Sequence, residues 1–389
     1  MKVYMFPGQG SQSRGMGGDL FDRFSDVTAK ADAILGYSIR ELCLDDPRNE
    51  LASTQFTQPA LYVVNALSYL RKIEDTGQTP DFLAGHSLGE FNALLAGGCF
   101  DFETGLKLVQ KRGELMGQVS SGGMAAVMNS SRDEIEEKLK ANGLNNVYLA
   151  NYNTPSQIVI SGAIDEIAAA ESILMQGKVR YYPLATSGAF HSAYMRDAMA
   201  KFREVIQGVR FEPPRIPVVA NVTARPYRSQ TMAETLTRQI ASTVRWCESM
   251  QYLLATGAAR REPVDFEELG NGDVLTKMAF TIKTQTPESV LSEILRSEQE
   301  ASAPAEAEPP EIPVAADADH AAIVALADVG EKVAAWNKAY PIGSKLRSTV
   351  LDYSDLETTT EAVVLFGHRA AVYMKGYNGY FDLEELAPA

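Results

Sequence analysis

The stretch Gly85-His86-Ser87-Leu88-Gly89 decides the fold. It follows a short apolar run at Asp81–Ala84 and precedes a helical pattern at Glu90–Ala96. A GxSxG sequence between a strand and a helix is typical of a nucleophile elbow, in which the serine lies at the tip of a sharp turn. The glycines avoid collisions with neighbouring backbone, and the helix N-terminus favours developing negative charge. The alternative is a Gly-Ser turn in which Ser87 only caps the helix.

The chain around this motif alternates short apolar runs with helical patterns from Met1 to about Ser297, which favours βαβ units and a parallel sheet. Helical patterns include Tyr62–Lys72 and Thr104–Met116. The predicted strands are Lys2–Phe6, Phe82–Ala84, Met124–Met128, Val147–Asn151, Ile158–Ser161, Val179–Pro183, Val218–Asn221 and Phe266–Leu269.

One part of this region has a different rhythm. Residues 122–189 contain three or four predicted strands and two helices, which is typical of a ferredoxin-like β-α-β-β-α-β unit. We therefore predict an α/β protein. Its large domain comprises residues 1–121 and 190–297, and residues 122–189 form a smaller subdomain inserted into it.

The composition changes after Ser297. Residues 298–318 are rich in Ala, Glu and Pro, and such a segment cannot bury enough apolar surface to offset its ordering entropy. We predict an acidic linker there. A helix from about Asp319 to Trp336 and four β patterns follow, so residues 319–389 are predicted to form a small, mostly β unit. The β patterns are Lys345–Leu351, Glu361–Phe366, Arg369–Met374 and Tyr380–Leu383, with a turn at Asn378-Gly379.

The composition excludes several classes of function. A net charge of −14 argues against a general nucleic-acid binder. No apolar stretch approaches the roughly 20 residues that span a bilayer, and Met1–Phe6 is too short for the apolar core of a signal peptide. The three cysteines and four histidines do not show metal-ligand spacing. We expect a cytoplasmic monomer without a metal site that binds neither nucleic acid nor membrane.

A serine nucleophile needs a base, and the chain has only four histidines. His86 is adjacent to Ser87, and consecutive side chains diverge in an elbow, so we expect it to be a packed structural residue. His320 and His368 lie beyond the predicted linker. His191 follows a predicted strand in a loop that contains Gly and Ser, which makes it the candidate base, although a lone loop histidine is more often structural.

Several further motifs, taken with the GxSxG stretch, resemble the malonyl-CoA:acyl carrier protein transacylases in order and spacing. The resemblance covers about residues 1–295. It is carried by Phe6-Pro7-Gly8-Gln9-Gly10-Ser11-Gln12, Thr57-Gln58-Pro59-Ala60, Gly85-His86-Ser87-Leu88-Gly89-Glu90, Arg112-Gly113-Glu114-Leu115-Met116, Asn153-Thr154-Pro155-Ser156-Gln157, Val159-Ile160-Ser161-Gly162, Ala189-Phe190-His191-Ser192 and Asn221-Val222-Thr223.

This resemblance implies an α/β-hydrolase-like domain with a ferredoxin-like subdomain. It also implies that Ser87 is the nucleophile and His191 the general base, in ping-pong transfer through an acyl-serine. The Leu88 amide and Gln9 would form the oxyanion hole. A backbone carbonyl at about Arg245 would orient the histidine. The donor would be malonyl-CoA and the acceptor the phosphopantetheine thiol of an acyl carrier protein, with no bound cofactor.

The resemblance gives Arg112 the role of deciding the substrate. By default, an arginine on a predicted helix is a solvated surface charge. In the family this position binds the free carboxylate of the malonyl group, which a guanidinium can grip through both oxygens. Phe190 is the form seen in malonyl-selective members. The remaining substrate-binding candidates are Gln58, Asn153, Gln157 and Asn221, although a turn-forming asparagine is the simpler interpretation for the two asparagines.

Two other functions stay open. An acyl hydrolase of the same fold would clear stalled carrier proteins, but such hydrolases generally lack the arginine at position 112. A non-catalytic scaffold would depend on the C-terminal unit instead. Gly270-Asn271-Gly272-Asp273 replaces the Gly-Pro-Gly-Lys often found in the family. This departure alters the turn and its charge near the pocket rim. The extra C-terminal unit suggests a member outside primary fatty-acid synthesis, such as a stand-alone transferase that serves polyketide synthases.

Overall fold

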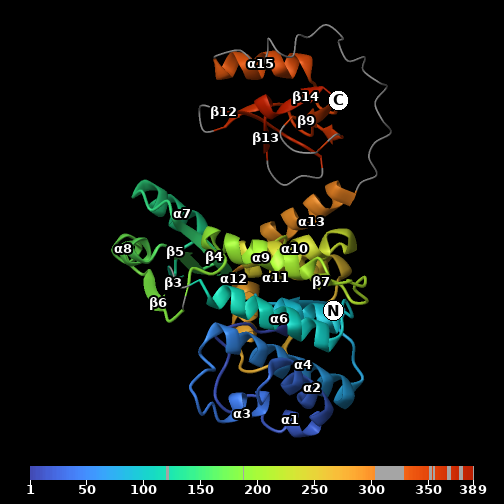
Figure 1. Cartoon of the computed structure of the whole chain (residues 1–389). Helices are drawn as coiled ribbons and strands as arrows, with labels where there is room; N and C mark the ends of the chain where they lie inside the picture. The colour runs from blue at the N-terminus through green and yellow to red at the C-terminus, as the bar shows by residue number, and fades with distance from the viewer. Residues whose placement is uncertain are drawn as a thin grey trace. The chain divides into compact units, whose positions relative to one another are not determined.

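The computed structural model describes residues 1–119, 122–186, 188–302, 328–349, 353, 355–365, 369–375 and 380–388. The chain divides into two compact units, Met1–Ala301 and Ser302–Ala389, and Figure 1 labels many of the elements of both.

The first unit contains eight labelled strands and thirteen labelled α-helices among its described residues. The strands are β1 (Lys2–Phe6), β2 (Phe82–Gly85), β3 (Gly123–Met128), β4 (Val147–Thr154), β5 (Gln157–Gly162), β6 (Arg180–Leu184), β7 (Val218–Val219) and β8 (Asp265–Glu268). The helices are α1 (Leu20–Arg23), α2 (Ser25–Leu35), α3 (Ile39–Leu44), α4 (Thr54–Thr76), α5 (Gly89–Ala96), α6 (Phe102–Gly117), α7 (Arg132–Ala141), α8 (Ile164–Leu174), α9 (Arg196–Ile206), α10 (Met232–Arg238), α11 (Trp246–Arg260), α12 (Val274–Gln285) and α13 (Glu288–Ser302).

A four-stranded parallel sheet with the order β7-β2-β1-β8 forms the centre of this unit. Alternate residues of β1 face opposite sides, as the two-residue repeat of a strand requires. Tyr4 and Phe6 join the core formed with α4, α5 and α6, whereas Val3 and Met5 join the core formed with α11 and α12. Since all four strands run the same way, the loops that follow their carboxyl ends meet at one edge.

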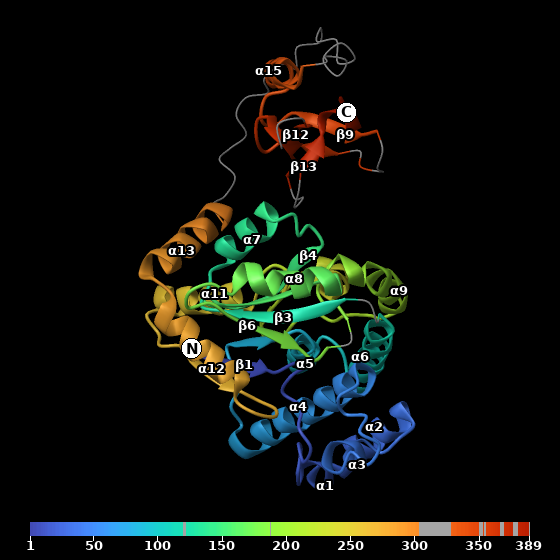
Figure 2. The same cartoon turned by 90° about the vertical axis from the view of Figure 1, so that its left-hand side faces the viewer.

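A second sheet is antiparallel, with the order β4-β5-β3-β6. Helices α7 and α8 cover one of its faces, as Figure 2 shows, and bury Ile135 and Ile167 against the strands. The helix α7 begins at a capping box between Ser131 and Glu134, which satisfies backbone N–H groups at the helix start. Backbone hydrogen bonds from Tyr152 to Val244 and from Val244 to Ala150, both 2.9 Å long, attach β4 to the larger part of the unit.

The sequence prediction of an α/β protein with a parallel sheet and a smaller strand-rich subdomain is confirmed. The main differences lie at element ends. β7 has only two residues, because the chain turns after Val219 and the backbone N–H of Ala220 donates to the Arg225 carbonyl oxygen. Helix α13 continues to Ser302, past the predicted start of the linker, and residues 303–327 lie outside the described part of the chain.

Among its described residues, the second unit contains the helix α15 (Val329–Ala339) and small antiparallel sheets, and the sheets agree with the prediction for the C-terminal region. The helix was predicted from about Asp319 to Trp336; residues 319–327 lie outside the described part, and α15 continues to Ala339. Its strands are β9 (Lys345–Ser348), β10 (Leu356–Glu357), β11 (Val363–Leu365), β12 (Arg369–Tyr373), β13 (Tyr380–Asp382) and β14 (Leu386–Pro388), in the orders β10-β9-β14 and β11-β12-β13. The core contains Trp336 and Tyr340, whereas Tyr353 and Tyr373 are exposed. The predicted turn at 378–379 lies outside the described residues.

None of the helices in the described ranges is both long and apolar enough to cross a membrane. The same ranges contain no group of three or more His, Cys, Asp or Glu residues that could hold a metal ion. The three cysteines are buried free thiols.

Candidate active site

Ser87 lies in the turn between β2 and α5, at the carboxyl edge of the parallel sheet. Its backbone φ is +50°, in the left-handed region that non-glycine residues rarely adopt. Glycines make this turn possible. A Cβ on Gly85 would lie 2.0 Å from the backbone of Gly89, and one on Gly89 would lie 2.0 Å from the Phe6 carbonyl oxygen. The turn therefore has the geometry of the predicted nucleophile elbow.

His191 approaches Ser87 from the loop before α9. Its Nε2 lies 2.8 Å from Ser87 Oγ, and its Nδ1 lies 2.9 Å from the backbone oxygen of Gln239. A carbonyl oxygen can only accept, so Nδ1 carries the proton and Nε2 is left to accept the serine proton. The prediction that the orienting carbonyl lies at about Arg245 is wrong. That carbonyl oxygen accepts hydrogen bonds from Ser249 within α11 instead.

The environment of His191 keeps its imidazole neutral. Burial, followed by the nearby Arg112 charge, lowers its pKa to about 3. A neutral imidazole at physiological pH is the form that can take a proton from the Ser87 hydroxyl.

Arg112 projects from α6 into the same site and is only 1% exposed. Its Nη1 donates to Gln58 Oε1 at 2.8 Å, and its Nη2 donates to Gln239 Oε1 at 2.8 Å and to Ser87 Oγ at 3.2 Å. Its Nε is buried without a hydrogen-bond partner among the described residues. Burial lowers the guanidinium pKa to about 10, so the group stays charged near neutral pH. The site thus holds a desolvated cation whose direct side-chain partners are neutral.

A small pocket of about 90 Å³ lies over these groups. Seven of the ten site residues predicted from the sequence line this pocket, namely Ser87 and six others. The fold therefore brings together residues that are far apart in the chain. The lining residues are Gln9, Gln58, His86, Ser87, Leu88, Arg112, Met116, Met124, Asn151, Leu184, Thr186, Phe190 and His191. The predicted residues among them, besides Ser87, are Gln9, Gln58, Leu88, Arg112, Phe190 and His191.

Three predicted substrate-binding residues do not line this pocket. Asn153 Oδ1 lies 2.8 Å from His86 Nε2, which holds that imidazole in a packed position against Trp246. Gln157 begins β5, in the antiparallel sheet. Asn221 accepts a hydrogen bond from the Ser87 backbone N–H at 2.8 Å, so it contacts the nucleophile's main chain. The direct substrate contacts of these three stay predictions. His320 and His368 lie outside the described residues.

Sequence reasoning missed two buried residues next to the site, Glu90 and Gln239. Glu90 follows the GxSxG motif directly, and a carboxylate among the apolar residues of a short helix was a signal that could have indicated it. Gln239 begins a short 3₁₀ helix, Gln239–Ala241, and gives no such signal. Its contacts with Ser87, Glu90 and Arg112 all come from residues more than 120 positions away in the chain.

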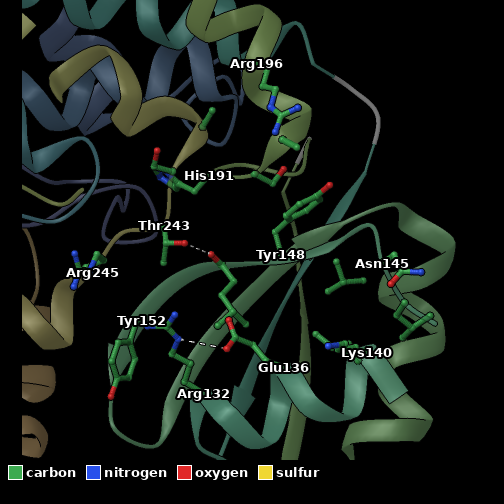
Figure 3. Close-up of a pocket in the computed structure, with 18 of the residues that line it drawn as sticks. Arg132, Glu136, Lys140, Asn145, Tyr148, Tyr152, His191, Arg196, Thr243 and Arg245 are labelled. Carbon is green, nitrogen blue, oxygen red and sulfur yellow. Dashed lines mark hydrogen bonds and ion pairs between the residues drawn. The ribbon is translucent and has the colours of Figure 1, made fainter. Parts of the chain in front are cut away.

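A larger groove of about 710 Å³ meets the pocket at His191, which lines both. Figure 3 shows its two walls. One wall comes from α7 and β4 of the smaller subdomain and carries Arg132 and Lys140. The other carries Arg196 and Arg245. Lys140 and Arg196 form no ion pair with another described residue, so the groove offers positive charge to a ligand.

The comparisons with known proteins agree with this geometry. Residues 3–260 match the family model described as acyl transferase domain. The polyketide biosynthesis malonyl CoA-acyl carrier protein transacylase PksC of Bacillus subtilis (strain 168) is 53% identical over 285 residues, which cover 73% of this chain and 97% of that protein.

Two solved structures are similar to about three quarters of this chain. The crystal structure of the malonyl CoA-acyl carrier protein transacylase from Burkholderia pseudomallei has a TM-score of 0.73 and 62% sequence identity, covering 74% of this chain and 99% of that one. A type II polyketide synthase acyl-carrier protein in complex with its malonyl-transacylase gives a TM-score of 0.68 at 31% identity, covering 76% and 99%. The chain therefore belongs to the acyl transferase domain family and, within it, to the malonyl CoA-acyl carrier protein transacylases.

Proposed function

We propose that this chain moves a malonyl group from malonyl-CoA, through an ester on Ser87, to the phosphopantetheine thiol of an acyl carrier protein in polyketide biosynthesis. The observation that carries the proposal is Arg112, a buried guanidinium 3.2 Å from Ser87 Oγ whose direct side-chain partners are neutral. An acyl group that ends in a carboxylate would supply a directly bonded anionic partner, whereas the charge of Glu90 interacts with Arg112 without a hydrogen bond between the two side chains. Leaving a buried cation without such a partner costs about 3–5 kcal/mol in typical cases.

The first half-reaction follows from the hydrogen bonds of Ser87. The hydroxyl gives its proton to His191 Nε2 as Oγ attacks the thioester carbonyl carbon. The C–S bond then breaks, and the protonated imidazole returns the proton to the departing coenzyme A thiolate. Arg112 Nη2 donates to Oγ, which helps to stabilise negative charge on that oxygen.

The second half-reaction reverses these roles. His191 takes the proton of the carrier's phosphopantetheine thiol, and the thiolate attacks the malonyl ester. The bond to Ser87 Oγ breaks, and His191 returns the proton to that oxygen. The Leu88 backbone amide and the Gln9 side chain, both in the wall of the pocket, are the proposed donors to the oxyanion in each half-reaction.

Pocket size supports selectivity for a short acyl group. Phe190 is 6% exposed and lines the pocket beside Gln58 and Met116. We propose that its ring limits branching next to the thioester, and that a malonyl group bound in so small a pocket displaces the water that would hydrolyse the acyl-serine.

The groove that meets the pocket at His191 is the proposed path for both donor and acceptor. Coenzyme A and a phosphopantetheine arm carry phosphate next to the same pantetheine chain, and Lys140 and Arg196 offer positive charge along the groove. A related malonyl-transacylase has been solved in complex with its acyl-carrier protein, which supports the proposal that an acyl carrier protein is the partner of this chain.

The domain description belongs to the same proposal. The strand–turn–helix at Ser87 supports an α/β-hydrolase-like large domain of residues 1–121 and 190–297. The sheet order β4-β5-β3-β6, with α7 and α8 between strands, supports a ferredoxin-like subdomain of residues 122–189.

The test is a loading assay with the full-length chain, radiolabelled malonyl-CoA and an acyl carrier protein in its phosphopantetheine-bearing form. Label on the carrier, lost in the Ser87→Ala variant, is the expected result. Release of free malonate faster than loading would indicate a hydrolase. Equal loading by Ser87→Ala would indicate that the site is not catalytic.

A further inference from the structure

Glu90 is a fully buried carboxylate that does not contact the reacting atoms. It lies in the first turn of α5, three residues after Ser87 in the chain. One carboxylate oxygen accepts hydrogen bonds from the Tyr227 hydroxyl and from the Asn221 backbone N–H, the latter at 3.1 Å. The other accepts from Gln239 Nε2 at 2.7 Å. Burial raises the pKa of Glu90 to about 7, and these three donors oppose that shift.

Two of these donors also hold the backbone of Ser87. The side-chain oxygen of Asn221 accepts from the Ser87 N–H at 2.8 Å, and Gln239 Nε2 donates to the Ser87 carbonyl oxygen at 2.6 Å. The backbone N–H and the carbonyl oxygen of Ser87 are therefore both held by residues that hydrogen-bond to the Glu90 carboxylate.

The carboxylate also fixes which way the Gln239 amide faces. Its Nε2 lies between the Ser87 carbonyl, which can only accept, and the Glu90 carboxylate, which can only accept while it is ionised. Its Oε1 consequently faces Arg112 Nη2, which can only donate, at 2.8 Å. A residue at position 90 that could also donate would leave only the Ser87 carbonyl to require a donor on this side of the amide, and this would weaken the preference against the reversed orientation, in which NH₂ faces the guanidinium.

We infer that Glu90 is a positioning residue that, through Gln239, holds the Arg112 guanidinium in the orientation that receives the acyl carboxylate. This inference rests on the proposed malonyl selectivity of the same site. Glu90 reaches the part of the pocket that receives the acyl carboxylate through the hydrogen bonds of Gln239 to Arg112. The negative charge of Glu90 also attracts the Arg112 guanidinium directly.

The test compares Glu90→Gln with Gln239→Met in the full-length chain. The first keeps the size of the side chain and removes its charge. The second removes the amide that connects Glu90 to Arg112. Gln251→Met is the matched control, because Gln251 is also a buried glutamine and its amide donates to Thr286 at 3.1 Å, outside the pocket. Acylation is followed as coenzyme A thiol release with malonyl-CoA and with acetyl-CoA.

We expect kcat/KM for malonyl-CoA to fall about ten- to hundredfold in both test variants, mainly through KM, because a hydrogen bond to a charged group is lost. We expect kcat/KM for acetyl-CoA to fall less than that for malonyl-CoA, because both substrates lose the support of the Ser87 backbone whereas only malonyl-CoA loses the oriented Arg112. We expect Gln251→Met to match the unmodified chain. An equal loss for both substrates, or an unchanged malonyl-to-acetyl ratio, would overturn the role of Glu90.

The outcomes separate this inference from the proposed function. If the unmodified chain shows no preference for malonyl-CoA over acetyl-CoA, the proposed function fails first. If that preference is present and survives in both variants, only the inference about Glu90 fails. Should Glu90→Gln lose its cooperative thermal unfolding transition, Gln239→Met carries the same test.

Discussion

Ser87 and His191, whose side chains meet at 2.8 Å, both have backbone φ angles in the left-handed region, +50° and +58°. Neither is a glycine, so each conformation costs roughly 1–3 kcal/mol and persists only where surrounding contacts hold it. At Ser87 these contacts are the close packing around Gly85 and Gly89, the hydrogen bond that the Ser87 N–H donates to Asn221, and the one that its carbonyl accepts from Gln239. The pair is thus strained at both members and held together by the fold around it.

The close approach at the elbow predicts that Gly85→Ala destabilises the protein. The added Cβ would meet the Gly89 backbone at 2.0 Å, and backbone cannot move aside as a side chain can. We expect a loss of about 3 kcal/mol or more, or a fall in Tm of about 6–12 °C by calorimetry. Gly208→Ala is the control, because its Cβ would meet nothing closer than 3.8 Å. Equal Tm values for the two variants would contradict a tightly packed elbow.

The carboxylate clamp predicts a change of substrate in Arg112→Ala. Removing the guanidinium should lower kcat/KM for malonyl-CoA by about 10²–10³-fold, since a buried charge pair is broken. Transfer or hydrolysis of uncharged acyl groups should be gained, because the pocket no longer contains a desolvated cation. Competition between malonyl-CoA and acetyl-CoA measures both effects. If the Arg112→Ala variant still prefers malonyl-CoA to acetyl-CoA, Arg112 does not bind the acyl carboxylate as proposed.

The burial of His191 predicts that its imidazole does not titrate near neutral pH. Its pKa of about 3 means that it stays neutral as the pH falls from 8 to 5, whereas an exposed histidine gains a proton near pH 6.5. Nuclear magnetic resonance of ring-labelled histidines checks this, because the chain has only four and His191→Asn assigns the signal. A midpoint near pH 6.5 for that signal would show that the base is solvated.

The same shift has a consequence for stability. Between about pH 6.5 and pH 3, the unfolded chain binds a proton at His191 and the folded chain does not. The free energy of unfolding should therefore fall as the pH is lowered through this window, and His191→Asn should remove that part of the pH dependence. Denaturant unfolding at several pH values measures it.

The division into two units predicts that the first acts alone in acylation. All the site residues lie within Met1–Ala301, and 285 residues of this chain cover 97% of the relative PksC. A chain that ends at Ser302 should acylate Ser87 at a rate within about twofold of the full chain, since it retains every site residue named above. Thiol release without a carrier protein measures this step. A loss of more than tenfold would assign the C-terminal unit a part in the chemistry.

Much of the site could be predicted from the sequence because its signals are local. The GxSxG stretch needs only neighbouring residues to specify a turn. The apolar run within Lys2–Phe6 predicts a buried strand, and the structure has β1 with the same bounds. Arg112 was assigned by resemblance alone. Its position in a predicted helix does not show whether the side chain points into the site or into solvent.

The remainder could not be predicted because it depends on contacts between distant residues or on main-chain atoms. The carbonyl that orients His191 was predicted six residues away from Gln239, since any residue can supply a backbone oxygen and none leaves a side-chain signal. The short strand β7 ends two residues earlier than predicted, because the chain turns after Val219 and the Ala220 N–H donates to the Arg225 carbonyl oxygen. Gln239 was missed because its role exists only once four distant segments meet.

The most direct test of the central claim is to locate the malonyl group during turnover. The full-length chain is incubated with malonyl-CoA, quenched and digested, and the modified peptide is identified by mass spectrometry; phosphopantetheine-bearing carrier is then added to a parallel sample. The account predicts one malonyl ester, on Ser87, that moves to the carrier thiol when the carrier is added. Carrier loading with Ser87 unmodified throughout, or a Ser87 ester that the carrier does not remove, would contradict it.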